Sequence, residues 1–556
     1  MKQNKYVIIL FLATLLLGAV SCKKQLDVGN PNQPTISGNV NTETGIIALA
    51  QGGVYLNGFY NGDGWLGNSY FSLPYGYAEL MGDVVGADAS NNQITTIGYP
   101  DYFILDDGTK TTNGSPQIPL IRTYNIYGGS NNNPLYNQWL NMYALNGACN
   151  QVLALVDGIK FSGDAASRAN TVKAWCYWWK GYAYASVGTM YYSGLIIDQN
   201  LGKSNNYLVN DSILARSNYY FNLAATTLSA ITSASDYSNV LGSLIPAFCQ
   251  TGHGGVLSQD EWTRNINTML ARNILLNKLS PFVNNNPAAT ITKSSISAMT
   301  AADWTSVLNY ASKGIQKGDL VFTGRSVSSN GFFTATGGTA ASMTTGPNIS
   351  TTFKIGMRYI QDFNTGDNRL ATNFRTGVTY KNNFFGTPYS LIDSLDQGTT
   401  GSYVIGGKLI GQYEVYIAGS YEENALMLAE ANIRSGNIET GLPFVDAVRT
   451  YQGAGVPAVT GTGLTLATAL NELVKERRVS LVFRGLSFYD IRRWGWSYDI
   501  SNGGGSYHNQ LITVDGVLNT NVTINYDFLD YWDVPADETA LNAPSPTGAP
   551  AKNPNF

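Results

Sequence analysis

Aromatic and short polar residues gather between positions 60 and 102, in a stretch without the helical periodicity that would bury them. A flat aromatic ring can cover the apolar C–H face of a sugar ring, and amide or carboxylate side chains can hydrogen-bond its hydroxyl groups. Trp65 and Tyr99 are examples in this stretch, and Phe332 and Phe333 form a second aromatic pair further along the chain. The pattern predicts a surface that binds a ligand by stacking, without catalysis.

Acidic residues could instead supply the two carboxylates of a glycoside hydrolase, which lie about 5 to 10 Å apart and have different pKa values. The chain has 38 Asp and Glu residues, and their spacing in the sequence does not exclude such a pair. It contains no G-x-S-x-G, H-E-x-x-H or Walker motif. We therefore expect a binding protein, with a secreted hydrolase as the alternative from another class.

Cysteine and histidine residues are too few to build a recognisable metal site. Apart from Cys22, the chain has Cys149, Cys176 and Cys249, and its histidines are His253 and His508. A structural zinc site needs four such ligands at suitable spacing. We expect no metal and no cofactor.

The N-terminus has the features of a bacterial export signal. Lys2 and Lys5 precede an apolar run over residues 6–20, and Ala-Val-Ser-Cys at 19–22 is similar to a lipobox. The run is shorter than the roughly 20 apolar residues that span a bilayer, and small residues follow it, as in a cleaved signal. We predict a signal peptide over 1–21, with residues 22–36 as lipid anchor and tether and Cys22 as the lipidated residue.

The charge of the chain excludes one class of partner. Charged residues make up 13% of the sequence, and the formal net charge is −4. A nucleic-acid-binding protein needs a basic face to neutralise phosphates, so we expect no nucleic acid. The absence of a basic cluster from the sequence also favours a neutral glycan over an acidic one.

Helical segments must position the candidate residues. Between 135 and 157, an apolar stripe at i, i+4 and i+8 predicts a helix with one buried face. Similar patterns predict further helices at 166–187, 211–231, 261–279, 301–316, 419–435, 440–451 and 466–483. These helices can pair as four hairpins, and two segments resemble tetratricopeptide units. The polar segments at 56–134 and 318–418 predict loops and short strands on one face of a single body over 37–556.

The segment 470–496 carries the most distinctive motif of the chain. It contains Glu476-Arg477, an apolar stretch, Gly485, Phe488 and the sequence DIRRWG ending at Gly495. This order resembles the C-terminal signature of the SusD/RagB family, which more often has Glu-Gly where this chain has Arg484-Gly485. The resemblance extends in order over nearly the whole chain through ELMGDV at 79–84, LAEA at 428–431, DVPADE at 533–538 and NPNF at 553–556, with a signature region of about 419–556.

The resemblance implies a mainly α, SusD-like fold, in which four tetratricopeptide-like hairpins carry loop and short-strand insertions that form the ligand face. It also implies a surface-exposed lipoprotein of the outer membrane that binds an oligosaccharide or polysaccharide. Such a protein delivers its ligand to a SusC-like TonB-dependent transporter. A peptide-binding member and a structural lid without a ligand remain alternatives. The candidate ligand-binding residues are Trp65, Tyr70, Tyr75, Tyr77, Asp88, Asn91, Tyr99 and Tyr102, with Phe332, Phe333 and Arg358 in the large insertion.

The signature itself is predicted to be structural. Arg477 lies on the apolar stripe of its helix, and its neighbours one turn away include no acidic residue. A buried unpaired charge is very costly, so we expect a distant partner for Arg477, with Asp490 as a candidate. The aromatic cluster Trp175, Trp178, Trp179 and Tyr182 is likewise expected to pack in the core.

We predict that Cys22→Ala releases the protein from the membrane fraction, because no later stretch of the sequence is apolar and long enough to anchor it. Fractionation of native cells and intact-mass measurement of the wild type check this. A variant that still sediments with outer membranes, together with wild-type protein that carries no acyl mass, would contradict the prediction.

Overall fold

A computed structural model describes the chain over residues 40–52, 76–87, 96–126, 136–325, 353–376, 389–391, 414–512 and 516–556. The predicted signal peptide, Cys22 and the tether lie outside these ranges. None of the helices within the ranges combines the length and apolarity that a membrane crossing requires.

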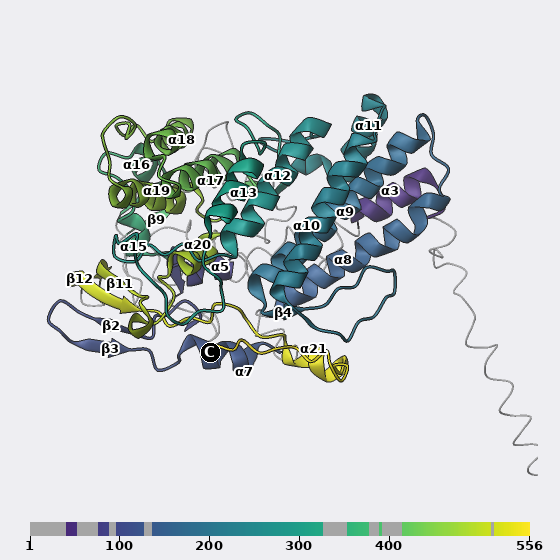
Figure 1. Ribbon diagram of the computed structural model, residues 1–556. Helices are drawn as coiled ribbons and strands as arrows, with labels where there is room; N and C mark the ends of the chain where they lie inside the picture. The colour runs from purple at the N-terminus through teal and green to yellow at the C-terminus, as the bar shows by residue number, and fades with distance from the viewer. Residues whose placement is uncertain are drawn as a thin grey trace, which may run out of the picture.

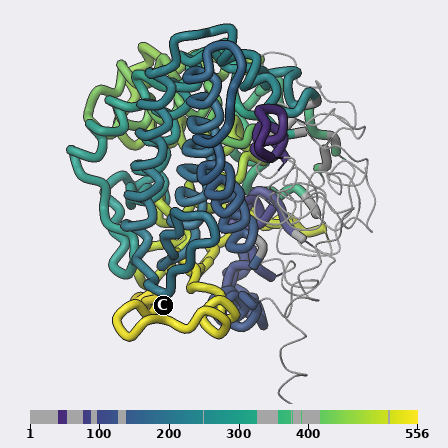
Figure 2. Tube along the Cα trace, turned by 90° about the vertical axis from the view of Figure 1, so that its right-hand side faces the viewer, coloured from purple at the N-terminus to yellow at the C-terminus, as the bar shows by residue number. Residues whose placement is uncertain are grey.

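Helices from the first half of the chain form one end of the molecule (Figure 1). They are α3 (Glu43–Gln51), α8 (Asn137–Leu155), α9 (Ala165–Met190), α10 (Asn210–Ser229) and α11 (Ala234–Leu244). The long helix α9 packs against the other helices of this group, and α3 also contacts α8 and α11 (Figure 2). The Asp164 side chain caps α9 by accepting a hydrogen bond from the Ser167 amide at 3.2 Å.

The helices that follow α11 in the chain form the rest of the helical body (Figure 1). They are α12 (Gln259–Leu276), α13 (Ala301–Ala311), α17 (Tyr421–Arg434), α18 (Ile438–Tyr451) and α19 (Leu466–Ser480). Helix α12 contacts α9 and α10, and thereby joins the two groups. From α12 the packing continues through α13 and α17 to α18, and α19 packs against both α17 and α18.

The predicted mainly helical architecture is confirmed. Each helix predicted from periodicity is present, although α13 ends at Ala311 instead of at 316. Consecutive helices pack as pairs in α8–α9, α12–α13 and α17–α18, and α10 packs back on α9. Periodicity missed α3 and α11 and several helices of one or two turns, which are too short to show a stripe. The short helices are α5 (Gly76–Met81), α7 (Gln117–Tyr124), α15 (Met357–Ile360), α16 (Asn368–Asn373), α20 (Ser487–Trp494) and α21 (Ala536–Leu541).

An antiparallel sheet of four strands lies below α15 and α19 in Figure 1. Its order is β11 (Ser506–Ile512), β12 (Leu518–Asn525), β2 (Tyr102–Ile104) and β3 (Lys110–Thr112). The β11–β12 hairpin was not predicted, because its polar residues do not alternate cleanly with apolar ones. The remaining strands form short pairs, namely β1 (Val85–Ala87) with β7 (Phe353–Ile355), β4 (Ser193–Gly194) with β5 (Leu208–Val209), β6 (Thr323–Arg325) with β10 (Glu414–Tyr416), and β8 (Phe374–Arg375) with β9 (Ser390–Leu391).

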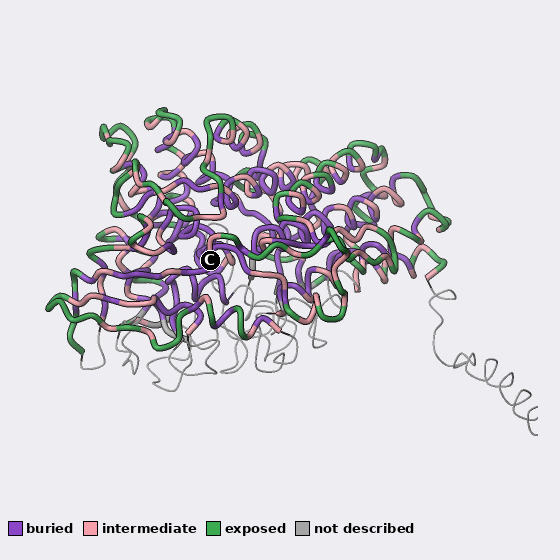
Figure 3. Tube along the Cα trace, turned by 60° about the horizontal axis from the view of Figure 1, so that its bottom comes forward, coloured by how far each residue is buried: buried purple, intermediate pink, exposed green. Residues whose placement is uncertain are grey.

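The predicted aromatic cluster on α9 lies in the core. Trp175, Trp178 and Trp179 are fully buried, and Tyr182 is nearly so. The ring centre of Trp178 lies 4.6 Å from that of Phe322, which precedes β6. The cluster therefore joins the first helical group to the beginning of the large insertion, within the buried interior seen in Figure 3.

The signature arginines are buried and paired, as predicted for Arg477. Its Nε donates to Asp490 Oδ2 at 3.1 Å, while Arg493 contacts the same carboxylate and also binds Glu430 at 2.6 Å. Arg484, at the position where the family more often has Glu, forms an ion pair of 3.0 Å with Glu422 at the start of α17. This departure from the family pattern is therefore compensated by an acid on a neighbouring helix.

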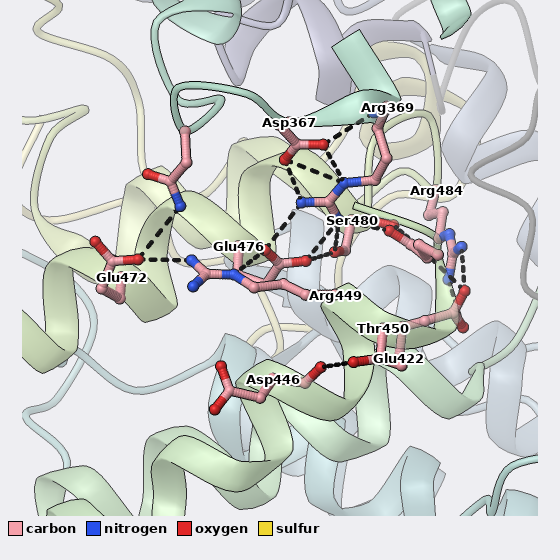
Figure 4. Close-up of polar contacts among 12 residues, drawn as sticks. Asp367, Arg369, Glu422, Asp446, Arg449, Thr450, Glu472, Glu476, Ser480 and Arg484 are labelled. Carbon is pink, nitrogen blue, oxygen red and sulfur yellow. Dashed lines mark hydrogen bonds and ion pairs between the residues drawn. The ribbon is translucent and has the colours of Figure 1, made fainter. Parts of the chain in front are cut away.

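A second group of buried charges connects the insertion to α18 and α19 (Figure 4). Arg369 binds Asp367 at 2.7 Å and Glu476 at 2.7 Å. Glu476 also accepts from Arg449 at 2.9 Å, and Arg449 reaches Glu472 at 2.6 Å. The charges compensate one another away from water, so each residue fixes the place of its neighbours.

We predict that Glu422→Gln lowers the free energy of unfolding by about 3 kcal/mol at pH 7, because it leaves Arg484 buried without its acid. Burial opposes ionisation of Glu422, but the guanidinium of Arg484 outweighs this effect and lowers the pKa of Glu422 to about 2. A depressed folded-state pKa stabilises the fold above the ordinary value of 4.5, and this stabilisation is lost as the pH falls towards 2. Urea unfolding at several pH values measures the difference between wild type and variant.

The matched control is Asp157→Asn, since Asp157 pairs with Lys173 but is 77% exposed. It should cost less than about 1 kcal/mol. The prediction for Glu422 is wrong if its variant is as stable as this control, or if its deficit is the same at pH 7 and pH 2.5.

Candidate ligand groove

The predicted ligand-binding residues divide between described and undescribed parts of the chain. Outside the described residues lie Trp65, Tyr70, Tyr75, Asp88, Asn91, Phe332 and Phe333. Tyr102 is partly exposed on β2, and the ammonium group of Lys110 lies 3.7 Å from its ring centre. Tyr99 is buried, with 7% of its surface exposed.

Tyr77 and Arg358 are occupied within the body of the protein. Tyr77 lies in α5, which packs against α20, and the Tyr77 side chain is almost inaccessible to solvent. Arg358 donates through Nε to Asp83 at 2.7 Å, and the Tyr526 hydroxyl donates to the same carboxylate at 2.7 Å. The side chains of Tyr77 and Arg358 therefore serve packing and charge pairing, and we do not include them in the candidate site.

A polar groove of about 400 Å³ lies between the β11–β12 hairpin and α19. It combines exposed aromatic rings with amide side chains, which together match the chemistry expected for a sugar ligand. Its lining residues are Phe282, Asn284, Asn285, Gln361, Asp362, Asn471, Val474, Lys475, Trp496, Ser506, Tyr507, His508, Asn509 and Gln510.

Strand β11 is distorted where it borders the groove. The register with β12 shifts on both sides of Asn509, and His508 takes a left-handed φ of +60°. Such a bulge redirects side chains and is common beside binding sites. As a result Tyr507 is 38% exposed, and the described part of the chain offers its hydroxyl no hydrogen-bond partner.

The opposite wall is a tight turn at Asn284 and Asn285. Both residues are left-handed, with φ values of +53° and +59°, a conformation that asparagine tolerates better than most residues. The Asn284 side chain accepts a hydrogen bond from the Tyr507 amide at 2.9 Å and so holds the turn against β11. Before the turn, the Phe282 amide donates to the Trp494 carbonyl at 2.9 Å. The signature helix α20 thus fixes the position of this wall.

Gln361 locks β11 to the segment that follows α15. Its Nε2 donates to Asn509 Oδ1 at 3.0 Å, and its Oε1 accepts from the Gln510 amide at 3.0 Å. The paired bonds use both ends of one amide, so the side chain has a single orientation. This lock joins the large insertion to the C-terminal hairpin.

Trp496 follows the left-handed Gly495 that ends α20. Its indole nitrogen donates to the Phe282 carbonyl at 2.7 Å, and the Arg478 guanidinium lies 5.4 Å from its ring centre. Arg478 also binds Asp362 at 2.5 Å. Burial raises the pKa of the Asp362 carboxyl, although the charge of Arg478 opposes the shift. The tryptophan is therefore held rigidly while its ring remains partly exposed.

The groove was not predicted from the sequence. Its residues come from four segments that are far apart in the sequence, around 284, 361, 471–475 and 496–510. The adjacent Tyr507 and His508, in a polar stretch without helical period, were the available signal. Tyr102 lies on β2, in the same sheet as β11, but is not among the residues that line the groove.

A narrower pocket of about 70 Å³ lies between α8, α9, α12 and the segment around Arg484 and Tyr489. Its cationic side chains are already paired, Arg272 with Glu423 and Arg484 with Glu422. Over the described ranges, no group of three His, Cys, Asp or Glu residues could hold a metal ion. We therefore place the candidate site in the larger groove.

Comparison with known proteins relates the chain to one family. Residues 421–545 match the model of the SusD family. No curated protein sequence matches the chain significantly.

Solved structures resemble the whole fold. A SusD superfamily protein from Bacteroides vulgatus is 13% identical, with 93% of this chain and 99% of that chain covered and a TM-score of 0.58. A second protein of this superfamily from Bacteroides vulgatus is 14% identical, with 92% and 99% covered and a TM-score of 0.55. A SusD-like carbohydrate binding protein from Bacteroides fragilis is 14% identical, with 90% and 98% covered and a TM-score of 0.51. At this level of identity, the likenesses show a shared fold.

Proposed function

We propose that this chain, whose residues 421–545 match the model of the SusD family, is an outer-membrane lipoprotein that binds an oligosaccharide and passes it to a TonB-dependent transporter. The match to the SusD family supports the expectation of a binding protein over an enzyme. The lipid anchor at Cys22 and the SusC-like partner belong to the proposal.

The observation that carries the proposal is the chemistry of the groove. Two partly exposed aromatic rings, Trp496 and Tyr507, lie among amide side chains that can donate and accept hydrogen bonds. This combination suits a sugar, which has apolar C–H faces and a rim of hydroxyl groups. The SusD-like structure from Bacteroides fragilis is described as a carbohydrate binding protein, which supports the same ligand class here.

The groove gives little support to a hydrolase. Hydrolysis of a glycoside needs two carboxylates on either side of the bond. Among the described residues that line the groove, Asp362 is the one carboxylate, and it is bound to Arg478 at 2.5 Å. A peptide ligand would use the same amides, and a purely structural lid would bind neither glycan nor peptide. The binding experiment distinguishes these two alternatives from a glycan-binding protein.

We predict that Tyr507→Ala weakens glycan binding roughly tenfold or more, because a stacked aromatic side chain typically contributes about 2 kcal/mol. Calorimetric titration against a panel of oligosaccharides and peptides measures the affinity, and product analysis of the same mixtures measures turnover. Tyr507 is exposed, so the thermal midpoint of the variant should stay close to that of wild type.

The matched control is Tyr219→Ala, which removes a similarly exposed tyrosine, 50% accessible, from α10. It should leave the affinity unchanged. A loss in Trp65→Ala with full affinity in Tyr507→Ala would move the site to the segment first predicted. Release of product would overturn the binding function.

We also predict that mild detergent extraction of the native membrane, followed by pull-down of this protein, recovers a TonB-dependent barrel. The expectation rests on family membership alone, so it is an argument by analogy. Mass spectrometry of the recovered material identifies the partner. Repeated recovery of the lipoprotein by itself, under conditions that preserve other membrane complexes, would count against the transporter.

A further inference from the structure

The charges of the groove do not cancel. Asp362 lines the groove, and its charge is neutralised by the buried Arg478, whose Nε lies 2.5 Å from the Asp362 carboxylate. Lys475 also lines the groove and is partly exposed, and no described residue forms an ion pair or hydrogen bond with its ammonium group. Apart from His508, the other lining side chains are uncharged. Counted together, Asp362, Arg478 and Lys475 leave one positive charge at the groove.

Lys475 is accompanied by a second donor on the same helix face. Asn471 lies one turn earlier on α19, also lines the groove and also has no hydrogen-bond partner among the described residues. Side chains at i and i+4 on a helix are about 5–6 Å apart at their Cβ atoms. An ammonium and an amide at this separation can hold an anionic substituent and a neighbouring hydroxyl group of one sugar unit.

The position of Lys475 in the fold argues against a structural role. The next turn of α19 pairs its charges inward, with Glu476 bound to Arg369 and Arg449, and Arg478 bound to Asp362. Lys475 directly precedes Glu476 in sequence but lines the groove instead. The ammonium group of a partly exposed lysine is hydrated, so Lys475 can face the groove without a compensating acid.

We propose that the groove selects acidic oligosaccharides, and that Lys475 binds the carboxylate or sulfate group while Trp496 and Tyr507 contact the sugar rings. This inference rests on the proposed function and specifies its substrate class. It differs from the expectation of a neutral glycan, which relied on the absence of a basic cluster from the sequence. A single lysine is enough to favour an anionic ligand when the charges of Asp362 and Arg478 cancel each other.

The experiment compares matched pairs of ligands that differ only in charge. Oligosaccharides containing uronic acids are titrated beside their methyl esters, and sulfated oligosaccharides beside their desulfated forms. Wild-type protein is expected to bind the acidic member of one pair roughly fivefold to tenfold more tightly. The corresponding difference in binding free energy lies between the typical contribution of an exposed ion pair and that of a hydrogen bond to a charged group. The pair that shows the preference identifies the anionic group.

Lys475→Met should reduce this acid-to-neutral ratio to about one, and Lys475→Arg should retain most of it. Lys313→Met, which removes an exposed lysine at the end of α13, should leave the ratio as in wild type. High salt should lower the affinity for the acidic ligand more than the affinity for the neutral one. Thermal unfolding verifies that each variant is folded.

Two results would overturn the inference and leave the proposed function intact. One is equal binding of acidic and neutral members in wild type, with Tyr507→Ala weakening both. The other is an acid preference that persists in Lys475→Met. Failure of wild type to bind any glycan would instead contradict the proposed function itself.

Discussion

The burial of arginine side chains around the signature segment is the constraint on which the rest of the structure depends. Arg478, Arg492 and Arg493 are almost inaccessible to solvent, and a guanidinium cannot lose its charge to escape an apolar environment. Each must therefore meet acids or carbonyls from elsewhere in the chain. Arg492 donates to the carbonyls of residues 189, 276 and 530, at 2.8, 2.9 and 2.7 Å. One side chain thus joins the ends of α9 and α12 to the C-terminal segment.

The same constraint produces the groove. Arg493 donates to Ser280 at 3.0 Å and places the strand-like segment that leads to the Asn284 turn. Arg478 binds Asp362, and its guanidinium lies 5.4 Å from the ring centre of Trp496. The Trp496 ring and both walls of the groove are therefore fixed before a ligand binds, so binding has no entropic cost of ordering these segments. A signature that is structural in character, as the burial of Arg477 indicated, still determines where the ligand-binding chemistry lies.

The sequence was informative where a regular pattern repeats and uninformative where segments meet. The apolar stripe through Leu470 and Leu473 predicted α19, and the lack of a local acid beside Arg477 pointed correctly to Asp490. Aromatic density between 60 and 102 did not distinguish Tyr77, which packs in the core, from Tyr102, which is partly exposed. The groove depends on left-handed asparagines, a bulge at His508 and the Gln361 lock. These are long-range contacts of irregular backbone, which no periodicity in the sequence encodes.

The lining of the groove contains two kinds of polar residue, and the difference bears on how such a protein can evolve. Asn284, Gln361 and Asn509 hold the walls together through hydrogen bonds within the protein. Asn285, Asn471 and Lys475 have no such bonds among the described residues. Substitution of Asn471 or Lys475 costs the fold little, since surface changes away from structural contacts are usually nearly neutral. Ligand preference can therefore change at these two positions without loss of the scaffold.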